Sequence, residues 1–359
     1  MPFVQNMQRR KSKMDNNGSM MKVLVWEAPR VMALREQTQP TPNANEVVIK
    51  VAYAGICGSE LGGYLGHNSL RVPPLVMGHE LAGEVIETGT SVDAALKGQQ
   101  VTVNPLISCG ECRYCKQGQN HLCIKRKLIG AHLPGAYAEY LVVPAVNVFP
   151  LPAGLSMRIG ALAEPTACGV RIAEVAGNVK DEVALIVGAG PIGLLALQML
   201  LLRGAREIYI SDLGPERLEM AQALGGIPLN PKDVDVVQKL RDVTDGYGAA
   251  VTVDAVGSAM TRKQCVQAAR NAGTLVLTGL HEETSAMPAA EITRREIVVH
   301  GCFAYSPANF AEAVDLLAQD KIRLDPWIVE APLAEGGPWF DRLIDAPGNV
   351  AKVLLVPAL

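Results

Sequence analysis

The chain lacks any apolar run long enough to span a bilayer. Its best candidate, "IGLLALQMLLL" (residues 192–202), falls short of the roughly 18 residues that a transmembrane helix needs, and it directly follows a glycine-rich turn. We therefore expect a buried helix there. Residues 1–20 are basic but contain neither an apolar core nor a small-residue cleavage site, so they predict a disordered extension rather than a secretory signal.

Aromatic residues and net charge are also low. Phe, Trp and Tyr make up 4% of the 359 residues, and the formal net charge is -3. Few aromatic rings leave little surface for stacking on bases, and a nearly neutral chain has no electrostatic reason to bind nucleic acid or an anionic membrane. We expect a cytoplasmic protein whose partner is a small molecule.

The length predicts two domains, because 359 residues exceed one simple core. As far as about residue 150, short β-branched runs alternate with Gly/Pro turns, which indicates a mainly antiparallel β-rich domain. Beyond about residue 165, continuous apolar runs alternate with helical patterns, which is typical of a parallel sheet covered by helices. The last fifty residues hold one helix and one strand that we expect to return to the first domain.

A dinucleotide fingerprint follows one of these apolar runs. In "VALIVGAGPIGLLALQML", Gly188 permits a tight turn, Gly190 lets the backbone approach a pyrophosphate, and Gly193 allows close packing of helix on sheet. Asp212 ends the next strand nineteen residues after Gly193, where its carboxylate can accept hydrogen bonds from ribose hydroxyls and repel a 2′-phosphate. NAD is favoured over NADP. The predicted cofactor-binding residues are Gly188, Gly190, Pro191, Ile192, Gly193, Asp212 and Arg217.

The cysteines are not spread like a secreted disulfide framework. Four of the eight fall within fifteen residues, in "CGECRYCKQGQNHLC", which favours a metal in a reducing compartment. Two-residue gaps let thiolates converge on one tetrahedral centre, and four sulfurs leave no position for substrate. A structural zinc in a lobe at residues 105–125 is the preferred interpretation, with an iron–sulfur cluster as the alternative. The predicted ligands are Cys109, Cys112, Cys115 and Cys123.

A second set of candidate ligands is scattered along the chain. "GICGSELGGY" carries Cys57, "PLVMGHELAGEV" carries His79 and Glu80, and "ALAEPTACG" carries Glu164. Each has an ordinary structural explanation when taken alone. Together they supply one sulfur, one nitrogen and one or two carboxylates, and three protein ligands leave zinc an open position for water or substrate. This site would be catalytic.

Taken jointly, these motifs resemble the zinc-dependent medium-chain alcohol/polyol dehydrogenases. The resemblance runs from about Met21 to Leu359 and rests on "GICGSE", "GHELAGEV", the four-cysteine lobe, "AEP", "GAGPIG" with Asp212, and the terminal "KVLL". It implies an α/β architecture in which a Rossmann NAD-binding domain (167–304) is inserted into a GroES-like catalytic domain (21–166 and 305–359). It also implies a homo-oligomer, either a dimer or a tetramer.

The resemblance also implies roles for individual residues. Members with cysteine at the third ligand position look like simple alcohol dehydrogenases, whereas Glu164 here resembles the sorbitol and galactitol-phosphate branch. Cys57, His79 and Glu164 are then the implied catalytic zinc ligands, and Glu80 is a direct or alternate ligand or holds the zinc-bound water. Ser59 is the residue with which family members begin the relay of the substrate's hydroxyl proton.

The implied activity is hydride transfer between NAD and a secondary alcohol of a polyol, sugar alcohol or polyol phosphate. Many relatives carry a proton-relaying histidine where this chain has Gly62, so the proton must leave through water, cofactor ribose hydroxyls or another side chain such as His67. An amino alcohol such as threonine and a simple secondary alcohol are the alternative substrates. A non-catalytic nucleotide-binding relative is the alternative outside the enzymes.

Overall fold

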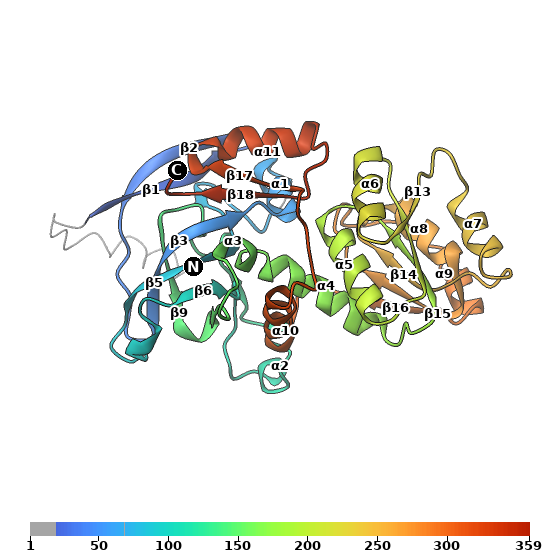
Figure 1. Cartoon of the computed structure of the whole chain (residues 1–359), viewed down its shortest axis with the longest axis horizontal. Helices are drawn as coiled ribbons and strands as arrows, with labels where there is room; N and C mark the ends of the chain where they lie inside the picture. The colour runs from blue at the N-terminus through green and yellow to red at the C-terminus, as the bar shows by residue number, and fades with distance from the viewer. Residues whose placement is uncertain (1–18, 68) are drawn as a thin grey trace, which may run out of the picture.

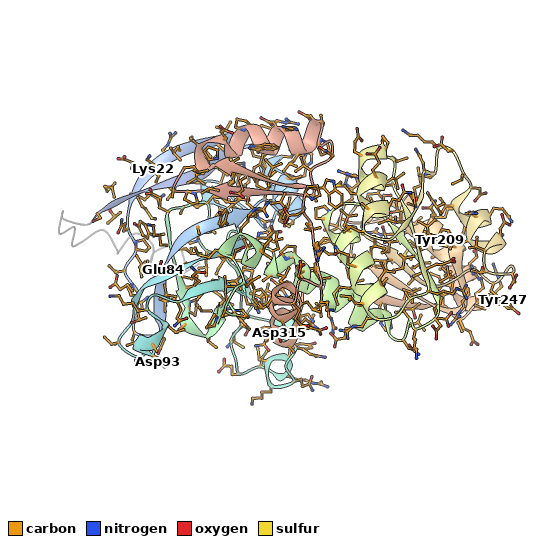
Figure 2. The ribbon with its side chains drawn as sticks, viewed as in Figure 1. Lys22, Glu84, Asp93, Tyr209, Tyr247 and Asp315 are labelled. Atoms are coloured by element: carbon orange, nitrogen blue, oxygen red, sulfur yellow. The ribbon has the colours of Figure 1, made fainter. Side chains whose placement is uncertain are left out.

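The computed structural model describes residues 19–67 and 69–359. Residues 1–18 of the predicted extension (1–20) lie outside them, and the boundary is corrected at its end, because Met20 pairs with Thr38 and begins strand β1 (Met20–Ala28). The molecule has two lobes, one built on a mixed sheet and the other on a parallel sheet, with helix α4 (Ala163–Ala176) between them (Figure 1). Lys22, Glu84 and Asp93 belong to the first lobe, and Tyr209 and Tyr247 to the second (Figure 2). Among the described helices, none combines the length and apolar character needed to cross a membrane.

The first lobe contains a seven-stranded sheet in the order β10-β6-β5-β3-β18-β17, with β9 paired to β3. Its pairings are antiparallel except for β17 with β18, and the two C-terminal strands extend the sheet formed by the N-terminal part of the chain. The strands are β3 (Glu46–Gly55), β5 (Glu80–Thr88), β6 (Gln100–Val103), β9 (Tyr140–Pro144), β10 (Val148–Pro150), β17 (Ile328–Pro332) and β18 (Lys352–Val356).

Smaller elements complete this lobe. A three-stranded sheet in the order β2-β1-β4 and a two-stranded sheet of β7 with β8 flank the main sheet. Their bounds are β1 (Met20–Ala28), β2 (Val31–Thr38), β4 (Leu75–Val76), β7 (Leu106–Ile107) and β8 (Lys127–Leu128). The helices are α1 (Gly58–Tyr64), α2 (Arg113–Lys116), α3 (Met157–Gly160), α10 (Pro307–Ala318) and α11 (Gly336–Asp345).

The second lobe is a doubly wound α/β unit. Six parallel strands run in the order β13-β12-β11-β14-β15-β16, and the strand order reverses beside β11. The strands are β11 (Val183–Val187), β12 (Glu207–Ser211), β13 (Ile227–Leu229), β14 (Ala249–Asp254), β15 (Ala269–Leu277) and β16 (Val298–Gly301). The helices are α5 (Pro191–Leu202), α6 (Pro215–Ala223), α7 (Val236–Asp242), α8 (Ala259–Ala268) and α9 (Ala289–Arg294).

Helix α4 links the two lobes through apolar packing. It lies against α5 of the parallel sheet and against α10, and most of its residues are buried. One continuous core contains residues of α4, α5 and β11 together with Phe310 and Leu354 from the C-terminal part of the chain. This shared core holds the lobes in contact, because each Å² of apolar surface removed from water contributes roughly 25 cal/mol to stability.

The glycine-rich run after Cys57 forms a helix. Helix α1 starts directly after Cys57, which has extended backbone angles at the N-cap position. The Glu60 carboxylate accepts a hydrogen bond from the Cys57 backbone N–H at 3.1 Å, which is half of a capping-box arrangement. This cap, and packing against α11, offset the low helix propensity of the glycines.

Candidate active site and metal centres

Three of the predicted ligands converge at one end of the mixed sheet. The thiol of Cys57, an imidazole nitrogen of His79 and a carboxylate oxygen of Glu80 lie within 4.8 Å of one another. Pairing of β3 with β5 brings this about, because Gly55 is the register partner of Glu80. A Cβ atom on Gly55 would lie 2.1 Å from Glu80 Oε2, so glycine is needed for this close approach.

Glu60 holds His79 from behind. Its Oε1 lies 2.9 Å from His79 Nδ1 and accepts the Gly78 backbone N–H at 2.8 Å, while Oε2 accepts the Tyr137 hydroxyl. Burial alone would raise the pKa of Glu60, but His79, Arg71 and the Tyr137 hydrogen bond lower it to about 2. A carboxylate on Nδ1 leaves Nε2 to face the Cys57 side, which is the arrangement that orients histidine on a metal.

Lys352 neutralises the buried carboxylate of Glu80. Its Nζ lies 2.7 Å from both carboxylate oxygens and also donates to the Ile56 carbonyl at 3.1 Å. Burial lowers the pKa of Lys352, but the charges of Glu80, Cys57 and Glu164 and the hydrogen bond to Glu80 together raise it above the usual value. These hydrogen bonds give the buried lysine and the buried carboxylate direct partners, which offsets the cost of removing both from water.

Glu164 lies beside this cluster but outside the set of mutually close donor atoms found among the described residues. It is in the first turn of α4, is 8% exposed, and accepts a hydrogen bond from the buried Tyr305 hydroxyl at 2.7 Å. Burial, followed by the negative charge of Glu80, raises its pKa. The structure thus separates the two candidate carboxylates, with Glu80 next to Cys57 and His79 and Glu164 held toward Tyr305.

Ser59 lies in the first turn of α1, close to Cys57. Its hydroxyl donates to Cys57 Sγ over 3.5 Å, and the residue is exposed. Gly62 lies further along α1, and a Cβ atom there would have no neighbour within 4 Å. The exposed hydroxyl therefore stands beside open space on this side of the helix.

The dinucleotide fingerprint adopts the predicted strand–turn–helix geometry. Gly188 has a φ of +103°, and a Cβ on Gly193 would lie 1.8 Å from the Gly188 carbonyl oxygen, so both positions require glycine. Gly190 is the N-cap of α5 and has open space where a side chain would be. Pro191 and Ile192 begin α5, whose free N–H groups suit an anion.

Asp212 anchors the end of β12 to this turn. Its Oδ2 accepts the Ala189 backbone N–H at 2.7 Å, and its Oδ1 accepts the Gly214 N–H at 2.9 Å. Arg217 Nη1 lies 3.8 Å from Asp212 Oδ2. The carboxylate is thus fixed at the carboxyl edge of the sheet, where dinucleotides bind in this type of fold.

One cavity connects the two sets of residues. It measures about 140 Å³ and is lined by Cys57 and Lys352 from the first lobe and by Gly190 and Arg217 from the second. The ligand cluster and the glycine turn therefore share one cleft between the lobes, as hydride transfer between a substrate and a dinucleotide requires.

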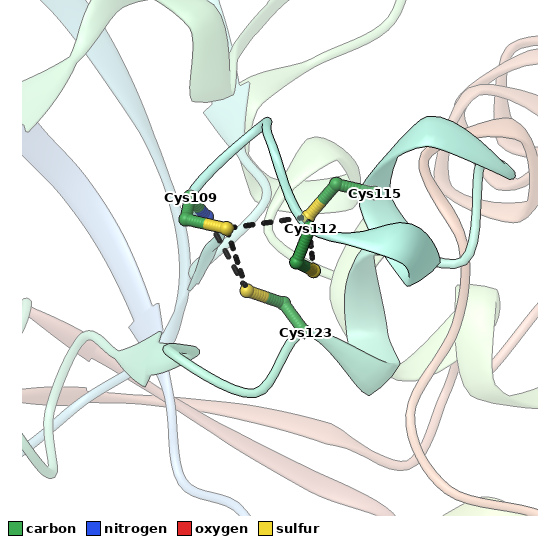
Figure 3. A group of neighbouring side chains, drawn as sticks. All are labelled: Cys109, Cys112, Cys115 and Cys123. Atoms are coloured by element: carbon green, nitrogen blue, oxygen red, sulfur yellow. Dashed lines mark hydrogen bonds between the residues drawn. The ribbon is translucent and has the colours of Figure 1, made fainter.

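The four clustered cysteines form a separate group (Figure 3). The sulfur–sulfur distances are 3.5 Å for Cys112–Cys115, 3.5 Å for Cys109–Cys123 and 3.9 Å for Cys109–Cys115. Zn–S bonds of 2.3 Å in a tetrahedron place the sulfurs about 3.8 Å apart. These distances fit a single ion, whereas an iron–sulfur cluster would hold the sulfurs much farther apart.

Comparison with known proteins identifies the class of protein that this fold and site define. Residues 43–153 match the alcohol dehydrogenase GroES-like domain, and residues 191–319 match the zinc-binding dehydrogenase domain. A sorbitol dehydrogenase from Halalkalibacterium halodurans is 34% identical over 334 residues, covering 90% of this chain and 95% of that protein. An L-threonine 3-dehydrogenase from Pyrococcus abyssi is 38% identical over 252 residues, covering 69% and 72%.

Solved structures agree with this result. Galactitol-1-phosphate dehydrogenase from Escherichia coli has a TM-score of 0.87 at 28% identity, covering 94% of this chain and 100% of that one. The chain belongs to the zinc-dependent medium-chain alcohol dehydrogenase family. The predicted α/β architecture, with a GroES-like and a Rossmann part, and the predicted class of enzyme are both confirmed.

Three buried residues of this site were missed from the sequence: Glu60, Tyr305 and Lys352. Glu60 follows the N-cap position by three residues, so the capping-box spacing was a usable signal. Lys352 stood in the quoted terminal motif, but the partner of a lone lysine cannot be read from spacing. Tyr305 carried no local signal, because it meets Glu164 only when the chain returns to α4.

Proposed function

We propose that the protein oxidises a secondary alcohol of a polyol, sugar alcohol or polyol phosphate to the ketone, with NAD as hydride acceptor. The observation that carries this proposal is the cleft that Cys57 and Gly190 line together, with His79 and Glu80 beside Cys57. The names of the relatives, sorbitol dehydrogenase and galactitol-1-phosphate dehydrogenase, support a polyhydroxylated substrate.

Cys57, His79 and Glu80 are the proposed ligands of the catalytic zinc. Their donor atoms lie close enough for one ion, and the sulfur, nitrogen and oxygen set suits zinc. We assign the third position to Glu80 rather than Glu164, because only Glu80 belongs to the close group. Lys352 then offsets the negative charge that Glu80 adds to that of the Cys57 thiolate. When bound, zinc supplies Lewis acidity at the substrate hydroxyl, and NAD supplies the hydride acceptor.

Glu164 and Ser59 are the proposed groups for handling the substrate. The Tyr305 hydrogen bond fixes one Glu164 oxygen, so the other can accept a substrate hydroxyl and orient the carbon that loses hydride. Ser59 is exposed at the same cluster and takes up the hydroxyl proton as the alcohol becomes a ketone. Glu164→Gln should then lower turnover while leaving zinc bound, whereas Glu80→Gln should lower zinc content.

NAD is proposed rather than NADP because of Asp212. A fixed carboxylate at the end of β12 can accept hydrogen bonds from two ribose hydroxyls, while a 2′-phosphate would meet its negative charge. Arg217 lies beside Asp212 and so is partly neutralised. The ratio of kcat/KM for NAD to that for NADP tests this, and a ratio below one would contradict it.

A second zinc is proposed in the four-cysteine lobe, where it would be structural. Four thiolates close the coordination shell, and the sulfur spacing suits a tetrahedral ion. His121 is buried nearby but is not needed as a ligand. All eight cysteines are free among the described residues, which supports the proposed cytoplasmic location.

A homo-oligomer is also proposed. Strand β16 is the edge of the parallel sheet, and all four of its residues are exposed, including Val298 and Val299. An exposed apolar edge invites pairing with a second copy about a two-fold axis. Light scattering during size-exclusion chromatography tests the state, and Val299→Lys should reduce the mass if this edge is used.

The substrate is tested by incubating the protein with NAD and a panel of polyols, polyol phosphates, threonine and simple secondary alcohols, following absorbance of NADH. Turnover of polyols or their phosphates is expected. Activity on threonine alone would favour the second candidate, which the threonine dehydrogenase relative supports. No turnover at all from zinc-loaded protein that binds NAD would favour a non-catalytic nucleotide-binding role.

A further inference from the structure

Arg71 is a buried cation beside the active site that the mechanism above leaves without a role. It is 2% exposed, and its side chain runs beneath α1, where a Cβ on Gly63 would lie 2.9 Å from Arg71 Cδ. Among the described residues it forms no ion pair within 4.0 Å, although Glu60 lies near enough to interact with its charge. Burying a guanidinium without a direct partner is unfavourable, so the position calls for an explanation.

The hydrogen bonds of Arg71 are directed at Ser59. Nη1 donates to the Ser59 carbonyl at 3.1 Å, and Nη2 donates to the Ser59 hydroxyl oxygen at 3.4 Å. Nε donates to the Gly130 carbonyl at 3.2 Å, which fixes the plane of the guanidinium. Two of the three contacts therefore reach the one residue proposed to take up the substrate's proton.

These contacts restrict what the Ser59 hydroxyl can do. A hydroxyl has one proton and two lone pairs, and Arg71 occupies one lone pair. The other lone pair is left for an incoming proton. The hydroxyl's own proton, which is directed at Cys57 Sγ over 3.5 Å, must turn away from the sulfur to leave in a different direction. Arg71 cannot accept it, because a guanidinium stays protonated at every relevant pH. The exposed side of α1 at Gly62 remains, where there is open space for water.

We propose that Arg71 is a positioning residue that holds Ser59 so that a proton moves through its hydroxyl from the substrate to water beside Gly62. As the carbon transfers hydride to NAD, the substrate O–H bond breaks and a new Ser59 O–H bond forms. The original Ser59 proton passes to water, so alcohol and NAD yield ketone, NADH and one proton. The inference rests on the proposed function, and it explains how the relay works with glycine at position 62.

A double-mutant cycle on the full-length, zinc-loaded protein tests this. Arg71→Gln removes the charge and the paired N–H groups of the guanidinium but keeps a polar side chain. Ser59→Ala removes the hydroxyl through which the proton moves, and the double variant combines both changes. Arg35→Gln is the matched control, since Arg35 is an exposed arginine of the same lobe. The measurements are kcat and KM for the best polyol of the panel, the solvent deuterium isotope effect on kcat, zinc content, NADH affinity and melting temperature.

We expect Arg71→Gln to lower kcat by about 10- to 100-fold, with KM changed by less than about threefold. This loss is smaller than the roughly 10²- to 10⁴-fold contribution of a whole proton-transfer group, because Ser59 itself remains. The solvent isotope effect should rise, while zinc content and NADH affinity stay at wild-type values. In the Ser59→Ala background the same substitution should have little further effect on kcat. Arg71→Lys keeps the charge without the planar fork and should fall between wild type and Arg71→Gln.

An equal loss of kcat from Arg71→Gln in both backgrounds would overturn the inference, because Arg71 would then act independently of Ser59. Unchanged kcat and isotope effect in Arg71→Gln would also overturn it. If Arg71→Gln does not fold, Arg71→Lys takes its place. A wild-type melting temperature together with a wild-type isotope effect in Arg71→Lys would also overturn the inference. A wild-type protein that turns over no member of the panel would instead overturn the proposed function itself.

Discussion

Replacing Glu60 by Gln is the perturbation that tests the architecture of the ligand cluster most closely. The Glu60 carboxylate accepts hydrogen bonds from Gly78, Cys57 and Tyr137 and faces His79 Nδ1. Gln has the same shape but offers one oxygen and an NH2 group. The NH2 group of Gln must then face N–H or O–H groups that donated to the carboxylate. At least one of these buried groups loses its acceptor, which lowers the free energy of unfolding by about 1–3 kcal/mol.

The effect on metal binding and catalysis follows from the orientation of His79. Without a carboxylate on Nδ1, the imidazole ring of His79 is held less firmly, and its Nε2 atom is a weaker ligand for zinc. Loss of such a partner typically costs 10- to 100-fold in metal affinity or activity. We expect Glu60→Gln to bind the catalytic zinc about 10- to 100-fold more weakly, while the four-cysteine site is unaffected.

Glu60→Gln should also change how the free energy of unfolding depends on pH. The pKa of Glu60 is lowered from 4.5 to about 2 in the folded protein, so its contribution to stability is present above about pH 4.5 and is lost as pH falls toward 2. A shift of this size corresponds to roughly 3 kcal/mol. The difference in unfolding free energy between wild type and Glu60→Gln should therefore shrink over that window.

Chelator competition followed by a zinc-sensitive dye measures the zinc affinity. Urea unfolding of metal-free protein between pH 2 and pH 7 measures the free energy of unfolding. In either equilibrium, about 1.4 kcal/mol corresponds to a tenfold change. Tyr137→Phe is the matched control, because it removes one hydrogen bond to Glu60 but keeps the carboxylate on His79. Wild-type zinc affinity in a folded Glu60→Gln protein would refute the assigned role.

Four other substitutions have defined outcomes. Lys352→Met leaves the buried Glu80 without its counter-charge and should destabilise the protein by about 3–5 kcal/mol in urea unfolding; a smaller loss than 1 kcal/mol would show that Glu80 is not charged. Asp212→Ser should raise kcat/KM for NADP relative to NAD, and an unchanged ratio would remove Asp212 from cofactor selection. Cys115→Ser should lower the melting temperature through loss of the lobe zinc, and zinc content equal to wild type would contradict this. Gly62→Ala fills open space within α1 and should stabilise the protein by about 0.5–1 kcal/mol, whereas destabilisation would mean that the space is occupied.

The sequence predicts the fold well because its signals are local and periodic. Continuous apolar runs identified β11, β12, β14, β15 and β16, and the glycine fingerprint located the turn into α5. Helix α1, directly after Cys57, has no such local signal. Its glycines have low helix propensity, and the cap by Glu60 and the packing on α11 that offset this form only in the folded chain.

The site residues also fall into two groups, those that local sequence spacing reveals and those that meet only in the folded chain. The four-cysteine group is dense in sequence, so spacing alone identified it. Cys57, His79 and Glu80 could be named as candidates, but the choice between Glu80 and Glu164 depends on strand register and on the partners Lys352 and Tyr305. Those partners come from the last sixty residues and meet the site only through folding, so no local pattern contains them.

The central claim is that Cys57 and His79 hold a catalytic metal distinct from the one in the four-cysteine lobe. The zinc-to-protein ratio of wild type, Cys57→Ser and Cys115→Ser, determined with the turnover of each preparation, tests it most directly. Two zinc ions are expected for wild type and one for each variant, with turnover abolished in Cys57→Ser. A Cys57→Ser protein that keeps two zinc ions, or that turns over substrate at the wild-type rate, would contradict the account.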